Sequence, residues 1–244
     1  MFIPLSDANA LRHLRFQYVT VTLIAINMLV YVFFVSGVFG DALEATAYSF
    51  GVVPAVYNDY ATLPEEYDLI PAWATLITYQ FVHGGFLHLV GNMLFLWVFG
   101  DNVEDALGHF RFLVFYLLCG VAAALVHDLV HPTSEVPLVG ASGAVSGVIA
   151  AYLMLHPRVQ VWVLVLWRVP LRLRAVWVLS FWVLLQVGML FGADEQDNTA
   201  WWAHIGGLAA GAVLVLVMRR PGVVLFDRDL PRVSQLRGGR SGQR

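Results

Sequence analysis

The sequence has no lysine, a single cysteine and few charges of either sign. Charged residues make up 13% of its 244 positions, whereas a soluble domain typically carries about 25%. Hydrophobic residues make up 59%. This balance excludes an ordinary soluble domain and predicts a polytopic membrane protein.

The single cysteine and the modest net charge exclude further classes. Cys119 lies inside an apolar run, so an intramolecular disulfide is impossible. The net charge of −3 gives no indication of a nucleic-acid partner. Four histidines lie at span ends or in flanks without metal-ligand clustering: His13, His109, His131 and His156. We therefore expect no metal and no cofactor.

Six apolar stretches are long enough, or nearly so, to cross a bilayer core of about 30 Å. They cover residues 19–39, 86–100, 110–130, 140–156, 175–191 and 201–218. The first has no small-residue cleavage site, so it is interpreted as a true span rather than a signal peptide. The second and fourth are short, at about 15 and 17 residues. A further apolar run, Val159–Trp167, lies between Arg158 and Arg168 and is too short to span, which predicts an interfacial segment.

The fourteen arginines are distributed in a way that predicts orientation. Arginines occur before the first span, between the second and third, between the fourth and fifth, and after the sixth, while the other loops carry only acidic charges. By the positive-inside rule both termini are cytoplasmic and the acidic loops face outward. We expect a cytoplasmic segment at 1–18, a six-span domain at 19–218 and an Arg-rich cytoplasmic tail at 219–244, disordered beyond about Asp229.

The first outer segment, residues 40–85, is long for a membrane-protein loop and mixes aromatic residues with three prolines. Irregular backbone is not tolerated in lipid unless protein covers it. We expect this segment to lie partly in the outer leaflet, packed on the protein.

The fourth span begins Gly140-Ala141-Ser142-Gly143. Flanking glycines expose the Ser142 hydroxyl and leave room for a substrate backbone. Glycine-flanked serines are also common packing sites in membrane helices. Ser142 is therefore either a nucleophile or a packing residue.

The sixth span places His204, Gly207 and Gly211 on one helical face. The two glycines allow close approach to the small residues of the fourth span, Gly143 and Gly147. An ionisable residue inside a span suggests function, so His204 is a candidate base. The alternative is a neutral histidine hydrogen-bonded to a carbonyl.

At the start of the second span, His88 and Asn92 are four residues apart and share one face of a helix. They are either hydrogen-bond donors directed at a reacting group or packing bonds between helices. The second, fourth and sixth spans all start on the outer side, so Ser142, His204, His88 and Asn92 lie in one layer. A serine, a histidine and extra donors at one depth form the set needed for acyl transfer: nucleophile, base and oxyanion hole.

These motifs resemble those of the rhomboid proteases, over nearly the full six-span length. The matching residues are His88 and Asn92, Gly140-x-Ser142-Gly143, His204 with Gly207 and Gly211, and Glu104-x-x-x-Gly108. The resemblance implies an all-α bundle of six transmembrane helices and a Ser142–His204 dyad without an obligatory acid. It also assigns His88, Asn92 and the Ser142 backbone N–H to the oxyanion hole.

Two positions depart from the family pattern. Trp73-Ala74-Thr75 lacks the arginine of a Trp-Arg pair, which puts the anchoring of that loop in doubt. Ser146 stands where some members place an aromatic that stacks on the base histidine, which leaves the orientation of His204 open. Ser146 is also a rival nucleophile, but it lies one turn deeper than Ser142.

The predicted function is that of an intramembrane serine endopeptidase that cuts single-span membrane proteins near their outer end, within a lipid bilayer. The alternatives are a catalytically inactive rhomboid-like protein that binds membrane clients, and a small transporter. The absence of lysine suggests a GC-rich bacterial genome, hence a bacterial inner membrane with the active site open to the outer side. His83 is expected on a loop surface and His127 at the interface. The sequence does not give the oligomeric state.

Overall fold

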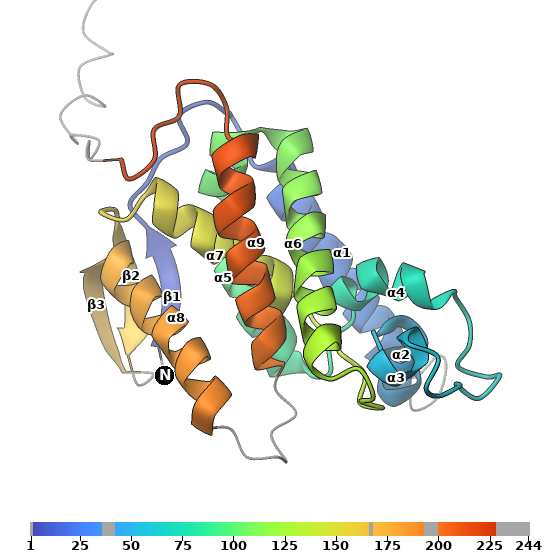
Figure 1. Ribbon diagram of the computed structural model, residues 1–244. Coiled ribbons are helices and arrows are strands. Elements are labelled where there is room, and N and C mark those ends of the chain that lie inside the picture. The colour runs from blue at the N-terminus through green and yellow to red at the C-terminus, as the bar shows by residue number, and fades with distance from the viewer. Residues whose placement is uncertain (1, 36–41, 166–167, 193–199, 228–244) are drawn as a thin grey trace, which may run out of the picture.

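Six apolar helices form the body of the protein (Figure 1) in a computed structural model that describes residues 2–35, 42–165, 168–192 and 200–227. They are α1 (Tyr18–Val35), α5 (Phe86–Leu107), α6 (His109–Val130), α7 (Ser142–Leu155), α8 (Ala175–Gly192) and α9 (Trp201–Met218). Each coincides with an expected apolar stretch. Four of them, α1, α5, α6 and α9, are long and apolar enough to cross a membrane. Because α7 and α8 are shorter apolar helices, the count of six spans stays a prediction.

Helix α5 continues to Leu107, beyond the end near residue 100 that its apolar run predicted. Its last turns carry carboxylates that the N-terminal segment satisfies. Glu104 accepts hydrogen bonds from the Thr20 backbone N–H at 2.8 Å and the Thr20 hydroxyl at 2.7 Å, at the start of α1. Asp105 accepts the backbone N–H groups of three consecutive residues: Arg12, His13 and Leu14. Burying a carboxylate is unfavourable unless hydrogen bonds compensate for its lost hydration. Because Glu104 and Asp105 have such bonds, the helix can continue past the end of its apolar run.

The expectation of an all-α protein is wrong in one respect, because the described chain also contains a three-stranded antiparallel sheet. Its strands are β1 (Phe2–Asp7), β2 (Gln160–Val165) and β3 (Val169–Arg174), in the order β1-β2-β3. Strand β2 occupies most of the run that was predicted to be an interfacial segment. Val161 and Val163 are buried whereas Trp162 between them is 41% exposed. This alternation of period two, in β-branched residues, is the signal of a strand.

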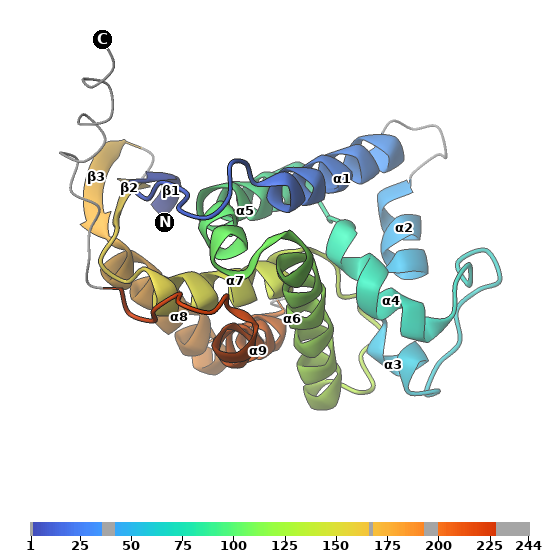
Figure 2. The ribbon, with the colours of Figure 1, turned by 90° about the horizontal axis from the view of Figure 1, so that it is seen from above.

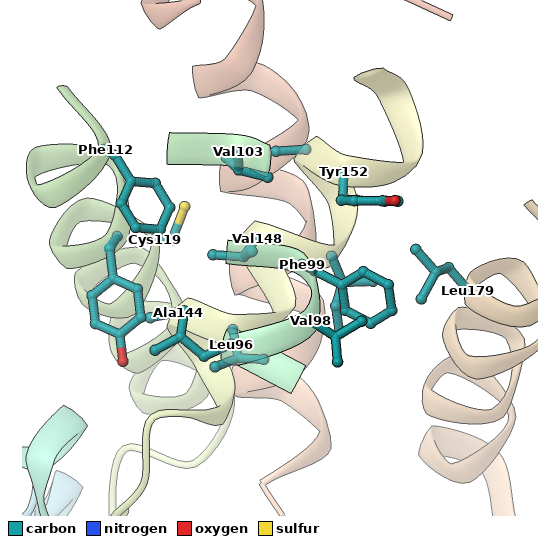
Figure 3. Packing of buried hydrophobic residues seen from close by; sticks show 14 of the residues in the cluster. Leu96, Val98, Phe99, Val103, Phe112, Cys119, Ala144, Val148, Tyr152 and Leu179 are labelled. Carbon is teal, nitrogen blue, oxygen red and sulfur yellow. The ribbon is translucent and has the colours of Figure 1, made fainter. Parts of the chain in front are cut away.

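Helix α7 lies in the middle of the helical body, and Figure 2 shows it among α5, α6 and α9. Every residue from Gly143 to Tyr152 is buried. Figure 3 shows Ala144 and Val148 of α7 packed beside Cys119 and Phe112 of α6 and Phe99 of α5.

The backbones of α7 and α9 are in direct contact. A Cβ atom added to Gly207 would lie 1.9 Å from the Gly143 carbonyl oxygen, and one added to Gly211 would lie 2.2 Å from the Gly147 carbonyl oxygen. The predicted match of small residues between these two helices is confirmed. Because α9 carries His204 and α7 carries Ser142, this contact fixes how closely the two side chains approach.

The long segment before α5 forms α2 (Ala42–Phe50), α3 (Pro54–Tyr57), α4 (Ala72–Thr78) and the 3-10 helix η1 (Tyr79–Phe81). It supports the loop that leads to Ser142. Val52 and Leu138 exchange two backbone hydrogen bonds, of 3.0 and 2.7 Å, and the Gly140 N–H donates to the Tyr79 carbonyl at 2.9 Å. The segment is thus packed on protein, as expected.

The first part of the predicted C-terminal tail also packs against the helices. The Arg220 N–H donates to the Ala106 carbonyl at 2.9 Å, and Asp227 pairs with Arg12 at 2.8 Å. The remainder, including the stretch predicted to be disordered beyond Asp229, lies outside the described residues. The segment just before α1 and the segment after α9 therefore meet near the end of α5.

Candidate active site

Ser142 is the first residue of α7, and the turn before it depends on Gly140. Gly140 has φ +119°, a conformation that side chains with a Cβ rarely adopt. A Cβ atom there would also lie 2.6 Å from Cε1 and 2.7 Å from Nε2 of His88. As in any helix, the first N–H groups of α7 have no intrahelical acceptor. Ser142 therefore combines a hydroxyl with a backbone N–H that is free to bind an anion.

His204 lies in the first turn of α9 and contacts Ser142 directly. His204 Nε2 is 2.9 Å from Ser142 Oγ, although the two residues are 62 positions apart. On the other side of the ring, Nδ1 is 2.7 Å from Oε1 of Gln186 in α8. The rings of Trp182 and Trp201 lie 6.2 and 5.8 Å from the imidazole, between centroids.

Gln186 was missed in the sequence, which had left the orientation of His204 open. A signal was present, because Gln186 is the one carboxamide in the apolar run from Ala175 to Phe191. Polar residues inside spans usually face the protein interior and bind a specific partner. Gln186 is 6% exposed. The aromatic contact absent at Ser146 comes instead from Trp182 and Trp201.

Ser146, the rival nucleophile, is bonded within its own helix. Its hydroxyl donates to the Ser142 carbonyl at 2.7 Å, and its side chain is fully buried. Unlike Ser142, it does not line the cavity described below. Depth along α7 separates the two serines, as the sequence predicted.

A cavity of about 970 Å³ brings together all four of the residues that sequence reasoning placed in one layer: Ser142, His204, His88 and Asn92. Gln186 and Trp182 line it as well. Asn92 is 7% exposed, and its Nδ2 has no hydrogen-bond partner among the described residues. A buried N–H group without an acceptor costs folding free energy. Such a group in a native structure suggests that a bound molecule accepts its hydrogen bond.

One further histidine differs from its predicted position, and another joins the cavity lining. His83, expected on a loop surface, is 2% exposed, and its Nε2 accepts the Ala141 N–H at 3.4 Å. Burial, followed by the neighbouring His88 ring, lowers the pKa of His83 to about 3, so the ring is neutral near pH 7. Through this hydrogen bond, His83 holds the backbone of Ala141, the residue before Ser142, in place. His127, in the last turn of α6, also lines the cavity, while its predicted place at the interface stays a prediction.

Fold and site together define a helical membrane protein with a serine–histidine pair in a cavity that both polar and apolar side chains line. A family model described as the Rhomboid domain matches residues 71–221. The chain belongs to the rhomboid family and is an integral membrane protein.

Several relatives share this similarity. Rhomboid-like protein 11, chloroplastic, of Arabidopsis thaliana is 32% identical over 179 residues, which is 69% of this chain and 60% of that protein. Rhomboid protease GluP of Bacillus subtilis is 30% identical over 65% of this chain and 28% of its own length. The putative rhomboid protease YdcA of the same organism is 34% identical over 47% of this chain and 59% of its own length. The chain thus spans at most 60% of the length of these relatives.

Proposed function

We propose that the protein is an intramembrane serine endopeptidase in which Ser142 is the nucleophile and His204 the base. The observation that carries this proposal is the 2.9 Å contact between Ser142 Oγ and His204 Nε2 in the cavity that His88 and Asn92 also line. A serine hydroxyl is a weak nucleophile until an adjacent base takes its proton. The similarity to the rhomboid protease GluP and to the putative rhomboid protease YdcA supports the same activity.

In the proposed reaction, His204 Nε2 removes the Ser142 proton while Oγ attacks the carbonyl carbon of the scissile peptide bond. The tetrahedral intermediate collapses, the C–N bond breaks, and His204 gives the proton to the leaving amine. In the second half of the reaction, His204 takes a proton from water, and the resulting hydroxide attacks the acyl-enzyme. The ester bond breaks and His204 returns the proton to Oγ, which regenerates Ser142. The cavity lining includes polar side chains such as His88, Asn92 and Gln186, which supports entry of this water.

His88, Asn92 and the Ser142 backbone N–H are proposed to bind the oxyanion of the tetrahedral intermediate. The unpaired Nδ2 of Asn92 supports this role, since a donor reserved for the transition state has no partner beforehand. His88 lies against Gly140, directly before the nucleophile turn.

The proposed substrates are single-span membrane proteins, cut near the outer end of their helix. We also propose six spans, including α7 and α8, with both termini cytoplasmic. The distribution of the arginines supports this topology. The absence of lysine supports a bacterial plasma membrane, whereas the chloroplastic and mitochondrial names among the relatives favour an organelle membrane.

The test uses purified full-length protein in proteoliposomes with a single-span model substrate, followed by sequencing of the products. Wild type should cleave, while Ser142→Ala and His204→Ala should each abolish cleavage. Ser146→Ala is the matched control and should retain substantial activity. A fluorophosphonate should label Ser142 in wild type, and it should label Ser142 more slowly in His204→Ala. Cleavage by Ser142→Ala would disprove the assignment.

A second candidate function is that of an inactive membrane-client-binding protein. The name rhomboid-like, which relatives such as rhomboid-like protein 11 carry, favours it. It predicts binding of the model substrate without cleavage and without labelling of Ser142, so the same experiment separates the two.

A further inference from the structure

One face of α8 differs from the rest of that helix. Trp182 and Gln186 are four residues apart and line the cavity beside His204. The neighbouring Leu184 and Leu185 are 68% and 44% exposed. The helix thus presents apolar side chains outward and a single carboxamide inward.

The contact between Gln186 and His204 selects one tautomer of the neutral ring. A carboxamide oxygen can only accept a hydrogen bond. With Oε1 at 2.7 Å, Nδ1 must carry a proton, and Nε2 then holds the lone pair that points at Ser142 Oγ. The other tautomer would place a proton on Nε2, which could not then accept the serine proton.

We infer that Gln186 is a positioning residue for catalysis, which holds His204 in the tautomer and orientation that act on Ser142. This inference rests on the proposed protease function. Gln186 accepts the Nδ1–H bond that a carboxylate accepts in a serine–histidine–aspartate triad, but it carries no charge. Trp182, one turn earlier on α8, restricts the ring from the side.

The neutral partner has a consequence for pH dependence. A carboxylate would stabilise the imidazolium form of His204, whereas an amide stabilises it less. The other titratable groups that line the same cavity are all histidines: His88 from α5, His127 from α6 and His131 at the end of α6. Ser142 faces the ring from α7. None of these groups is an acid, so a carboxylate introduced at position 186 would be the first anion beside the ring among the described residues.

The experiment compares two substitutions and a control in the full-length protein. Gln186→Met keeps the length of the side chain but removes the acceptor, and Gln186→Glu keeps an acceptor and adds charge. Ser180→Ala, on the same helix but outside the cavity lining, is the control. For each variant, kcat and KM would be measured between pH 5 and 10, with Ser142 labelling used to count competent sites. Nitrogen-15 NMR of the histidines would report the tautomer.

Gln186→Met is expected to lower kcat by about 10- to 100-fold with KM changed less than about threefold, because the base is misoriented rather than the substrate. Its His204 signal should show a mixture of tautomers. Gln186→Glu should recover kcat to within about tenfold of wild type at high pH, with the acid limb of its profile moved to higher pH by about one unit. Ser180→Ala should match wild type.

Three results would overturn the inference. Wild-type kcat per competent site in Gln186→Met would show that the bond has no role in catalysis. Equal loss in Gln186→Met and Gln186→Glu with an unchanged pH profile would show that the side chain only packs. If wild type neither cleaves nor labels at Ser142, the protease proposal itself fails, and the positioning role fails with it.

Discussion

Gly207 of α9 lies directly against the backbone of Gly143 in α7, so that a Cβ atom added to Gly207 would stand 1.9 Å from the Gly143 carbonyl oxygen. His204 is one turn before Gly207, and Ser142 is next to Gly143. The distance between nucleophile and base is therefore set by a contact between glycines.

Gly207→Ala should push α9 away from α7 and separate Ser142 from His204. A displacement of about 1 Å at a reacting group can lower the rate about 100-fold, and overpacking of this kind costs about 1–3 kcal/mol of stability. Activity and melting temperature should both fall in the same preparation. Gly188→Ala on α8, where nothing lies within 4 Å of the added Cβ, is the control and should change neither. Full activity of Gly207→Ala would show that the glycine contact does not set the geometry of the site.

Loss of an oxyanion donor should reduce turnover more than substrate affinity. Asn92→Ala is expected to lower kcat by about 10- to 100-fold with KM changed less than about threefold, below the usual cost of one donor because other donors remain. His88→Ala should behave similarly, and the double variant should lose less than the product of the two. Val90→Ala, on the exposed side of α5, serves as the control. An intact kcat together with a large loss of thermal stability would instead make both residues packing bonds.

The carboxylate of Glu104 should matter for stability and not for chemistry. It is fully buried and accepts two hydrogen bonds from Thr20 at the start of α1. Glu104→Ala leaves these donors unpaired, which is expected to cost about 1–3 kcal/mol. The melting temperature in detergent should fall while kcat per labelled site stays constant. Glu66→Ala, at an exposed loop position, should leave both values unchanged, and a specific loss of kcat in Glu104→Ala would contradict the structural role.

Asp7 should make the protein less stable as the pH rises towards neutrality. Burial raises the pKa of Asp7 from 3.8 to about 6, although its carboxylate accepts bonds from Tyr152 and Asn102. The folded state therefore holds the proton more tightly than the unfolded state. The stabilisation is complete below about pH 4 and is lost as the pH rises through about 6.

The measurement is the difference in melting temperature between wild type and Asp7→Asn from pH 4 to 7.5. The amide keeps an acceptor without titrating, so the variant should gain relative to wild type as the pH rises. Asp68→Asn, at an exposed site, should show no such trend. If the difference in melting temperature between wild type and Asp7→Asn stays constant with pH, Asp7 does not cause the loss of stability towards neutrality.

The sequence alone determined where the helices lie and which residues share a depth. A run of apolar residues with few charges can only be accommodated in a membrane as a helix, because its backbone must bond internally. Position along such a helix fixes depth at about 1.5 Å per residue. The sequence therefore places four residues in one layer, and the cavity brings all four together: Ser142, His204, His88 and Asn92.

Tertiary structure decided what hydropathy does not encode. Helix α8 is apolar on nearly every side, and its one carboxamide indicates only that Gln186 faces the protein interior. Packing alone placed it against His204. The extension of α5 required partners about 85 residues away, since the Glu104 and Asp105 carboxylates are buried only because the N-terminal segment donates to them. The sheet likewise joins β1 to strands more than 150 residues later. Long-range pairing of this kind depends on how the whole chain packs, and a local pattern of residues does not specify it.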